Sequence, residues 1–155
     1  GIQAALLENP EIIVTFDADG QHNPKDIKKL TKPIIKGKAD FVIGSRMLDT
    51  KKMPWIKRLA NKAGNIFTWF LFGAYVTDSQ SGLRVFSRKA AEAIEIKTRG
   101  MEVSSEIIKE IKRNNLKIKE VPIKTIYTEY AIKKGQKWWH GFKVLGKLIL
   151  RKIMR

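Results

Sequence analysis

The sequence predicts an α/β fold in which a largely parallel sheet is flanked by helices. Short runs rich in Ile and Val alternate along the chain with longer segments of helical spacing. The run at 11–16 is apolar at successive positions, which is typical of a strand buried on both faces of a parallel sheet. With 43% hydrophobic residues among 155, the chain has enough apolar mass for the core of one domain.

The expected elements follow from these runs and from the turn residues between them. Strands are expected at 11–16, 39–45, 83–86 and 117–123. Helices are expected at 24–35, 54–73, 88–94, 103–114 and 136–155, after a helix tail at 1–8. Asn23 is the expected N-cap of the first full helix, Pro24 its first residue and Gly37 its end. The Lys and Pro residues of 117–123 indicate an edge strand.

Four strands are fewer than a sheet usually carries. Gly1 stands where a Met would start a chain, and the helix tail after it has no N-cap residue. We therefore expect the fold to be truncated at its N-terminus, with further strands before Gly1.

Composition limits the possible functions. The chain has no cysteine, which rules out disulfides and thiolate metal sites, and its two histidines lie far apart in sequence. A formal charge of +16 predicts phosphate-rich partners such as nucleotides, anionic lipids or nucleic acid. The longest apolar run, 66–76, is well short of the roughly 20 residues that span a bilayer. Any metal is expected to bind oxygen ligands, and any membrane contact to be at the surface.

Asp17 and Asp19 directly follow the first strand. A turn there can aim both carboxylates at one point outside the carboxyl edge of the sheet, where open α/β sheets bind ligands. Mg²⁺ or Mn²⁺ suits such a pair, because these ions take one or two carboxylates and complete their shells with water and phosphate oxygens. For an Asp-x-Asp sequence taken alone, the alternative is an Asx-type turn that ends the strand.

The string VTFDADGQHNP at 14–24 resembles the metal-binding signature of the inverting GT-A glycosyltransferases of family 2. It is most similar to the branch of dolichol-phosphate mannosyltransferases and polyprenyl-phosphate glycosyltransferases. Further blocks of that branch follow in order: FVIGSR at 41–46, DSQSGLRVF at 78–86 and EVPI at 120–123. The resemblance covers essentially the whole chain but lacks the family's N-terminal, nucleotide-binding portion. It implies a Rossmann-like GT-A fold with a mixed, mostly parallel sheet.

The resemblance also implies an activity, the metal-dependent and inverting transfer of a sugar from a nucleotide diphosphate to a polyprenyl (dolichyl) phosphate. Asp17, Asp19 and Gln21 would form the metal shell for Mg²⁺ or Mn²⁺, and Asp19 is counted among the catalytic residues as well. A cation there neutralises the charge that develops on the leaving diphosphate. A phosphate acceptor is already an anion at neutral pH and needs no general base.

The same resemblance assigns residues to the acceptor side. Arg46 and Arg58 match a phosphate clamp, and guanidinium groups suit phosphate geometry. Glu106 lies where many family members carry an acidic residue that faces the acceptor, although a helical surface carboxylate is an equal alternative. Ser81 and Gly82 are expected to shape a tight turn near the acceptor.

Two lysines and both histidines complete the candidates. Lys134 and Lys137 flank a Gly-Gln pair where family members often show Gly-x-Ser-Lys, and the departure leaves open which lysine reaches the phosphate. His22 is expected to be a turn residue, and His140 to lie at the level of lipid headgroups.

The chain divides into a catalytic part, 1–130, and a basic tail helix, 131–155. Aromatic and aliphatic residues recur at helical spacing in the tail among Lys and Arg, which is typical of a helix lying in an anionic membrane surface. A solvated helix packed on the core is the alternative. We expect peripheral attachment at the cytoplasmic face of a membrane.

Other classes of function remain as alternatives. A nucleic-acid-binding module fits the charge, but the sequence shows no helix-turn-helix, zinc finger or RNA-binding signature, and we expect no nucleic-acid partner. An inactive remnant that binds only membranes or a partner, and a transferase with a hydroxyl acceptor, stay open. The sequence does not define the sugar, the nucleotide, the lipid length or the oligomeric state.

Overall fold

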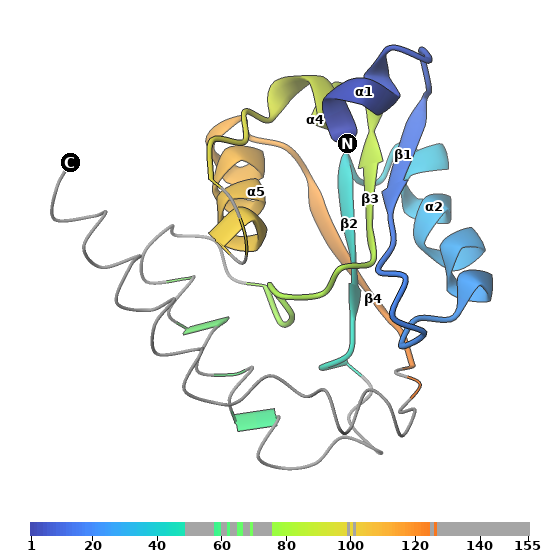
Figure 1. The fold of residues 1–155 in the computed structure, drawn as a ribbon, viewed down its shortest axis with the longest axis vertical. Coiled ribbons are helices and arrows are strands. Elements are labelled where there is room, and N and C mark those ends of the chain that lie inside the picture. Colours follow the sequence, from blue (N-terminus) through green and yellow to red (C-terminus); the bar gives the residue numbers. More distant parts are fainter. Residues whose placement is uncertain are drawn as a thin grey trace, which may run out of the picture.

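The computed structural model describes residues 1–48, 58–59, 62, 65–66, 69, 76–98, 100, 102–124 and 126. In this part of the chain, four strands form one sheet in the order β1-β3-β2-β4 (Figure 1). The strands are β1 (Ile12–Thr15), β2 (Phe41–Ser45), β3 (Arg84–Ser87) and β4 (Ile118–Pro122). Each lies within the expected run or one residue beyond it, and β4 lies at one end of the order, as predicted for an edge strand.

The α/β class is confirmed, but the sheet is less parallel than expected. β3 pairs antiparallel with both β1 and β2, and only β2 and β4 pair in parallel. β1, at the other end of the order, is only partly buried apart from Ile13, whereas β2 is buried throughout. The apolar run of β1 predicted a strand buried on both faces of a parallel sheet. Such a run indicates an apolar environment, but it does not indicate the direction of the partner strand.

The reversed strand decides which segments meet. β1, β2 and β4 run in one direction and β3 runs in the other. The residues that follow β1 and β2 therefore reach the same edge as the residues that precede β3. We call this the carboxyl edge of the sheet, meaning the edge where β1 and β2 end and β3 begins.

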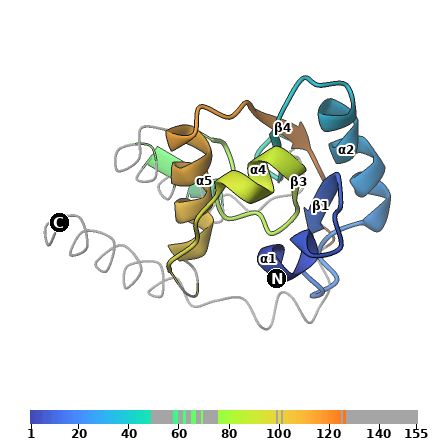
Figure 2. The same cartoon turned by 90° about the horizontal axis from the view of Figure 1, so that it is seen from above.

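Helices cover both faces of the sheet (Figures 1 and 2). One face packs against α2 (Ile27–Ile35), whose Leu30 is fully buried in a cluster with Val42 of β2 and Val85 of β3. The other face packs against α1 (Ile2–Leu6), α4 (Arg88–Ala93) and α5 (Glu102–Arg113). The core is thus two apolar layers, one on each side of β2 and β3.

The residues that were predicted to begin and end the first full helix lie at helix ends in the structure. Asn23 caps the 3-10 turn η1 (Pro24–Asp26), which leads into α2, and its side chain accepts a hydrogen bond of 3.0 Å from the amide of Lys25. Gly37 follows α2 with a φ of +64°, a conformation that glycine adopts without strain.

Part of the predicted pattern lies outside the described residues. Most of the helix expected at 54–73 lies there, although Arg58, Leu59, Lys62, Asn65, Ile66 and Trp69 are each described as helical. The whole of 131–155 and the division at residue 130 lie there as well. Within the described residues, no helix is long and apolar enough to cross a membrane.

Candidate functional site

Asp17 leaves the end of β1 and lies against the backbone of Gly82, just before β3. A Cβ atom on residue 82 would lie 1.8 Å from Oδ2 of Asp17, so only glycine allows this approach. The hydroxyl of Thr15 donates a hydrogen bond of 3.0 Å to the carbonyl oxygen of Gly82. The first strand and the turn before β3 are therefore in direct contact at the carboxyl edge.

Asp19 forms the Asx-type turn that the sequence left open as the alternative to a metal site. Its Oδ1 accepts from the amide of Gln21 at 3.0 Å, and its Oδ2 accepts from Nε2 of Gln21 at 2.7 Å. Both Asp17 and Asp19 are exposed. A carboxylate oxygen has two acceptor sites, so the turn leaves lone pairs for a further ligand.

The carboxylates at this edge fit a hard divalent cation only if a substrate supplies further oxygen ligands. In the part of the chain that the structure describes, no group of three or more His, Cys, Asp or Glu side chains is arranged to hold a metal ion. Two exposed carboxylates match the mode in which Mg²⁺ or Mn²⁺ is held by one or two carboxylates plus waters and substrate phosphates. The metal shell of Asp17, Asp19 and Gln21 stays a prediction.

His22 is buried directly behind Asp17. Its side chain is 3% exposed, its Nε2 lies 3.9 Å from Oδ2 of Asp17, and its ring meets Phe16 edge-on with centroids 5.9 Å apart. Burial, followed by the charge of Arg46, lowers the pKa of His22, although nearby carboxylates oppose the shift. The imidazole is therefore neutral at neutral pH, in a position more enclosed than the turn residue predicted from the sequence.

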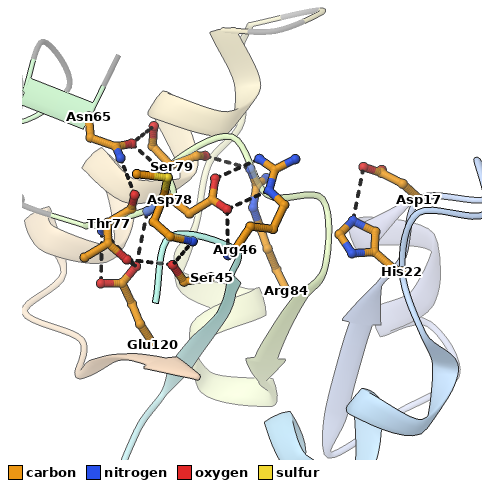
Figure 3. A network of polar contacts seen from close by, with 11 residues as sticks. Asp17, His22, Ser45, Arg46, Asn65, Thr77, Asp78, Ser79, Arg84 and Glu120 are labelled. Atoms are coloured by element: carbon orange, nitrogen blue, oxygen red, sulfur yellow. Dashed lines mark hydrogen bonds and ion pairs between the residues drawn. The ribbon is translucent and has the colours of Figure 1, made fainter. Parts of the chain in front are cut away.

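Arg46 follows β2 and forms a forked ion pair with Asp78 (Figure 3). Nε of Arg46 donates to Oδ2 of Asp78 at 2.7 Å, Nη2 donates to Oδ1 at 2.8 Å, and the amide of Arg46 donates to Oδ2 at 2.9 Å. The Asp78 side chain is 1% exposed and that of Arg46 is 21% exposed. Two-point pairing fixes the guanidinium plane, so Arg46 is pre-oriented at the carboxyl edge.

Glu120 of β4 fixes the segment that carries Asp78. Its Oε1 accepts from the amide and the hydroxyl of Thr77, both at 2.8 Å, and from the amide of Asp78 at 3.3 Å. The hydroxyls of Thr77 and Ser45 lie 2.6 Å apart, which ties the same segment to the end of β2. Asp78 thus receives its position from two strands.

Asn65 holds the other side of this turn. Its Oδ1 accepts from the amide of Ser79 at 3.0 Å and from the hydroxyl of Ser79 at 2.9 Å, and its Nδ2 donates to the carbonyl oxygen of Thr77. Ser79 is fully buried. The turn at 77–79 is therefore hydrogen-bonded on this side to Asn65.

Arg84, the first residue of β3, is a cation buried beneath the site (Figure 3). It is 6% exposed, and its Nη2 donates to the carbonyl oxygen of Ser79 at 3.0 Å and to Oγ of Ser104 at 2.8 Å. Burial lowers the pKa of Arg84 to about 10, against the opposing charges of Asp17 and Asp78. Figure 3 shows Asp17 and His22 facing the guanidinium groups of Arg46 and Arg84 across the edge.

Other predicted site residues lie elsewhere or are not described. Arg58 is exposed on a helical segment, and Lys134, Lys137 and His140 lie outside the described residues. Oε2 of Glu106 accepts from the amide of Lys97 at 3.0 Å, and from the amide and hydroxyl of Thr98 at 2.8 and 2.6 Å. Glu106 therefore anchors the chain before α5, and its predicted role toward an acceptor stays a prediction.

Sequence reasoning gave no role to Asp78, Arg84 or Glu120, although it identified the blocks that contain them. A signal was present for two of the three. Arg84 stands between Leu83 and Val85 in an apolar strand, and Glu120 stands in a strand next to Val121. A charged residue that is buried inside such a strand requires a partner, and for Arg84 this requirement points to the site.

A known protein family matches the part of the chain that contains these site residues. The sequence profile described as Glycosyl transferase family 2 matches residues 1–95, which include Asp17, Arg46, Asp78 and Arg84. The chain belongs to this family. The predicted family is thereby confirmed.

Relatives support the predicted branch of the family. A UDP-N-acetylglucosamine–dolichyl-phosphate N-acetylglucosaminyltransferase of Methanococcus voltae is 43% identical over 99% of this chain and 63% of its own length. A dolichol-phosphate mannosyltransferase of Pyrococcus furiosus is 30% identical over 79% of this chain and 37% of its own length. An uncharacterised protein of Methanocaldococcus jannaschii is 53% identical over 99% of this chain and 65% of its own length. The chain thus spans 63–65% of two relatives that it matches almost end to end.

Proposed function

We propose that the protein containing this chain transfers a sugar from a nucleotide diphosphate donor to a dolichyl or other polyprenyl phosphate, with inversion and with the help of a divalent cation. One observation carries the proposal. Asp17 and Asp19 follow β1, and at the same edge of the sheet Asp17 faces the oriented guanidinium of Arg46 after β2 (Figure 3), in a chain 43% identical to a dolichyl-phosphate sugar transferase. This edge offers the opposite charges that a metal–diphosphate and a phosphate acceptor require.

On the donor side, Asp17 and Asp19 would hold Mg²⁺ or Mn²⁺ together with oxygens of the donor diphosphate. When bound, the cation supplies charge neutralisation for the departing nucleotide diphosphate. Gly82 leaves room for the Asp17 carboxylate at this edge, and the hydrogen bonds from Gln21 orient the Asp19 carboxylate. The Asp19 carboxylate is thus oriented before the substrate arrives.

On the acceptor side, Arg46 is the best-supported residue. A polyprenyl phosphate is an anion and attacks the anomeric carbon once it is held in line with the leaving group, so positioning matters more than proton removal. Asp78 fixes the plane of the Arg46 guanidinium. Arg58, Lys134 and Lys137 are proposed as additional contacts to the acceptor phosphate on the strength of the sequence resemblance alone.

A membrane surface is proposed as the place of action, because the acceptor is a lipid. Leu59, Ile66 and Trp69 are 61, 48 and 52% exposed, and they recur at helical spacing where the sequence predicts a helix. The excess of positive charge in the sequence favours anionic lipid. Sedimentation with vesicles tests this proposal: we expect binding to vesicles rich in phosphatidylglycerol, weaker binding to phosphatidylcholine, and release by salt.

The activity is tested by the transfer of labelled sugar from a panel of UDP-sugars and GDP-sugars to a polyprenyl phosphate in the presence of Mn²⁺. The protein is used at its full natural length, beside an Asp19→Asn variant. Glu92→Gln is the matched control, since it also neutralises an exposed carboxylate, but one that pairs with Arg88 on α4. We expect a lipid-linked product from the natural protein and the control, and none after chelation.

Three outcomes separate the alternatives. Loss of product in Asp19→Asn but not in Glu92→Gln supports the role of the carboxylates. Transfer to a hydroxyl compound in place of the lipid phosphate would overturn the proposed acceptor. No product from any donor would favour the inactive module that binds only membranes or a partner.

A further inference from the structure

Among the described residues, three buried side-chain atoms lack a hydrogen-bond partner: Nδ1 of His22, Oγ of Ser81 and Nε of Arg84. His22, Ser81 and Arg84 are 5, 0 and 6% exposed. A buried polar atom without a partner costs about 1–3 kcal/mol, and native proteins leave few of them. Such atoms therefore indicate groups that a ligand or ordered water satisfies.

All three atoms belong to residues around one contact, the contact of Asp17 with Gly82. Ser81 precedes Gly82, and Arg84 follows it by two residues. His22 reaches Asp17 with its other ring nitrogen, at 3.9 Å. The polar groups that the fold leaves unsatisfied thus belong to residues at or next to this contact at the carboxyl edge.

The chemistry of the three groups indicates a neutral ligand rich in hydroxyl groups. Arg84 Nε–H is a donor, the Ser81 hydroxyl both donates and accepts, and Nδ1 of His22 donates or accepts according to whether it carries the proton. The charges nearby are three carboxylates, Asp17, Asp19 and Asp78, against two guanidinium groups, Arg46 and Arg84. The side chains alone therefore present no excess of positive charge that would select an anion at these three atoms.

We propose that His22, Ser81 and Arg84 bind hydroxyl groups of the sugar that is transferred, as an inner subsite beside the Asp17 carboxylate. This inference rests on the proposed function, because it assumes a nucleotide-sugar donor at this edge. It places Ser81 against the donor sugar and not the acceptor, and it gives the buried guanidinium of Arg84 a ligand contact. Ser79 and Ser104 hold the Arg84 guanidinium in place through Nη2, which leaves Nε for the sugar.

The test compares binding of a sugar nucleotide with binding of the bare nucleotide. The protein at its full natural length is titrated calorimetrically, with Mn²⁺, with UDP-N-acetylglucosamine and UDP, and with GDP-mannose and GDP. The variants are Ser81→Ala and Arg84→Lys, which keeps the charge. Ser87→Ala is the matched control, because Ser87 is a serine at the other end of β3 whose hydroxyl caps α4.

We expect Ser81→Ala to weaken binding of the preferred sugar nucleotide by about 3- to 10-fold, with the affinity for the bare nucleotide unchanged. Arg84→Lys is expected to lose more, about 10-fold or above, since its hydrogen bond is charge-assisted. The control should leave the ratio of the two affinities as it is in the natural protein. Should Arg84→Lys fail to fold, the Ser81→Ala ratio decides alone.

Other results would overturn the subsite. An unchanged ratio in Ser81→Ala would mean that the atoms bind ordered water only. Equal losses for the sugar nucleotide and the bare nucleotide would mean an anion site. If the natural protein bound no sugar nucleotide of the panel, the subsite would be wrong as well. The transfer assay is read separately, so that activity with an unchanged ratio leaves the proposed function standing without this inference.

Discussion

Asp17 can lie against residue 82 because this residue has no side chain. Replacing Gly82 with Ala would put a methyl group 1.8 Å from the carboxylate, so that Asp17 must turn away from the edge. We expect Gly82→Ala to lower transfer activity by about 100-fold, as displacements of about 1 Å at a reacting centre do. The measurement is the initial rate of transfer as a function of Mn²⁺ concentration.

Gly37→Ala is the control for this glycine. Nothing lies within 4 Å of a Cβ atom at Gly37, but its φ of +64° strains any other residue. We expect this variant to lose about 1 kcal/mol of unfolding free energy while transfer stays normal. A normal rate in Gly82→Ala would contradict the proposed role of the Asp17 position.

His22 makes stability depend on pH. Its pKa in the folded state is lowered by burial and by Arg46, so protons bind it more readily in the unfolded chain. The free energy of unfolding should therefore fall as the pH drops through the ordinary range of histidine, from about pH 7 to about pH 5. In His22→Gln we expect a shallower fall, measured by urea unfolding in both proteins at each pH; identical slopes would refute the assignment.

Single residues differ in how far the sequence predicted them. Asn23 and Gly37 were predicted as helix ends because capping depends on neighbours in the chain, and both are confirmed. The partner of Arg46 was not predicted, because Asp78 lies 32 positions away and only the paired strands bring it close. Glu106 was assigned by family resemblance, and its contacts with Lys97 and Thr98 depend on where the chain before α5 folds back.

At the level of elements, the fork between Arg46 and Asp78 joins the end of β2 to the turn before β3. Asp78→Asn leaves the Arg46 guanidinium without its two-point partner in a largely buried place. We expect the unfolding free energy to fall by about 3 kcal/mol, near the lower end for a broken buried pair because Arg46 keeps some access to water. Urea unfolding monitored by circular dichroism measures this loss.

The exposed pair of Arg88 and Glu92 on α4 is the matched comparison for this change. Its side chains are 44 and 52% exposed, and Nε of Arg88 lies 2.7 Å from Oε1 of Glu92. We expect Glu92→Gln to change the unfolding free energy by less than about 0.5 kcal/mol. If the two variants lost the same amount, the Asp78 pair would have no special structural role.

The positions of the strands could be predicted, but their directions could not. Apolar runs with turn residues at both ends identified β1, β2, β3 and β4 to within a residue or two. The direction of a strand depends on how the segments between strands cross the sheet. These connections have no hydrophobic periodicity from which the direction could be predicted. Asp17 and Asp19 predicted which edge of the sheet carries the site. That the segment before β3 reaches this same edge could not be predicted, because it depends on the reversed direction of β3.

At the level of the whole molecule, charge is the dominant feature. A net charge of +16 on 155 residues destabilises the compact state through self-repulsion. Raising ionic strength from about 10 mM to about 150 mM shortens the Debye length from about 30 Å to about 8 Å. We therefore expect the unfolding free energy to rise with NaCl over this range, measured by urea unfolding at constant pH.

A charge-reversed variant sharpens this prediction. Lys28 and Lys32 of α2 are both exposed, and Lys28→Glu with Lys32→Glu lowers the net charge by four. We expect a weaker dependence on NaCl in this variant. A salt dependence that is flat in the natural protein, or equal in both, would show that self-repulsion is not a significant term.

The reversed strand β3 has a consequence for motion. Because β3 is paired on both sides, its successive amides point alternately toward β1 and β2, and such central strands exchange hydrogen with solvent only through large openings. The turn at 77–82 enters the sheet through this strand. In a hydrogen-exchange experiment the residues next to the turn would therefore be among the slowest, and the site edge would open only when the sheet itself does.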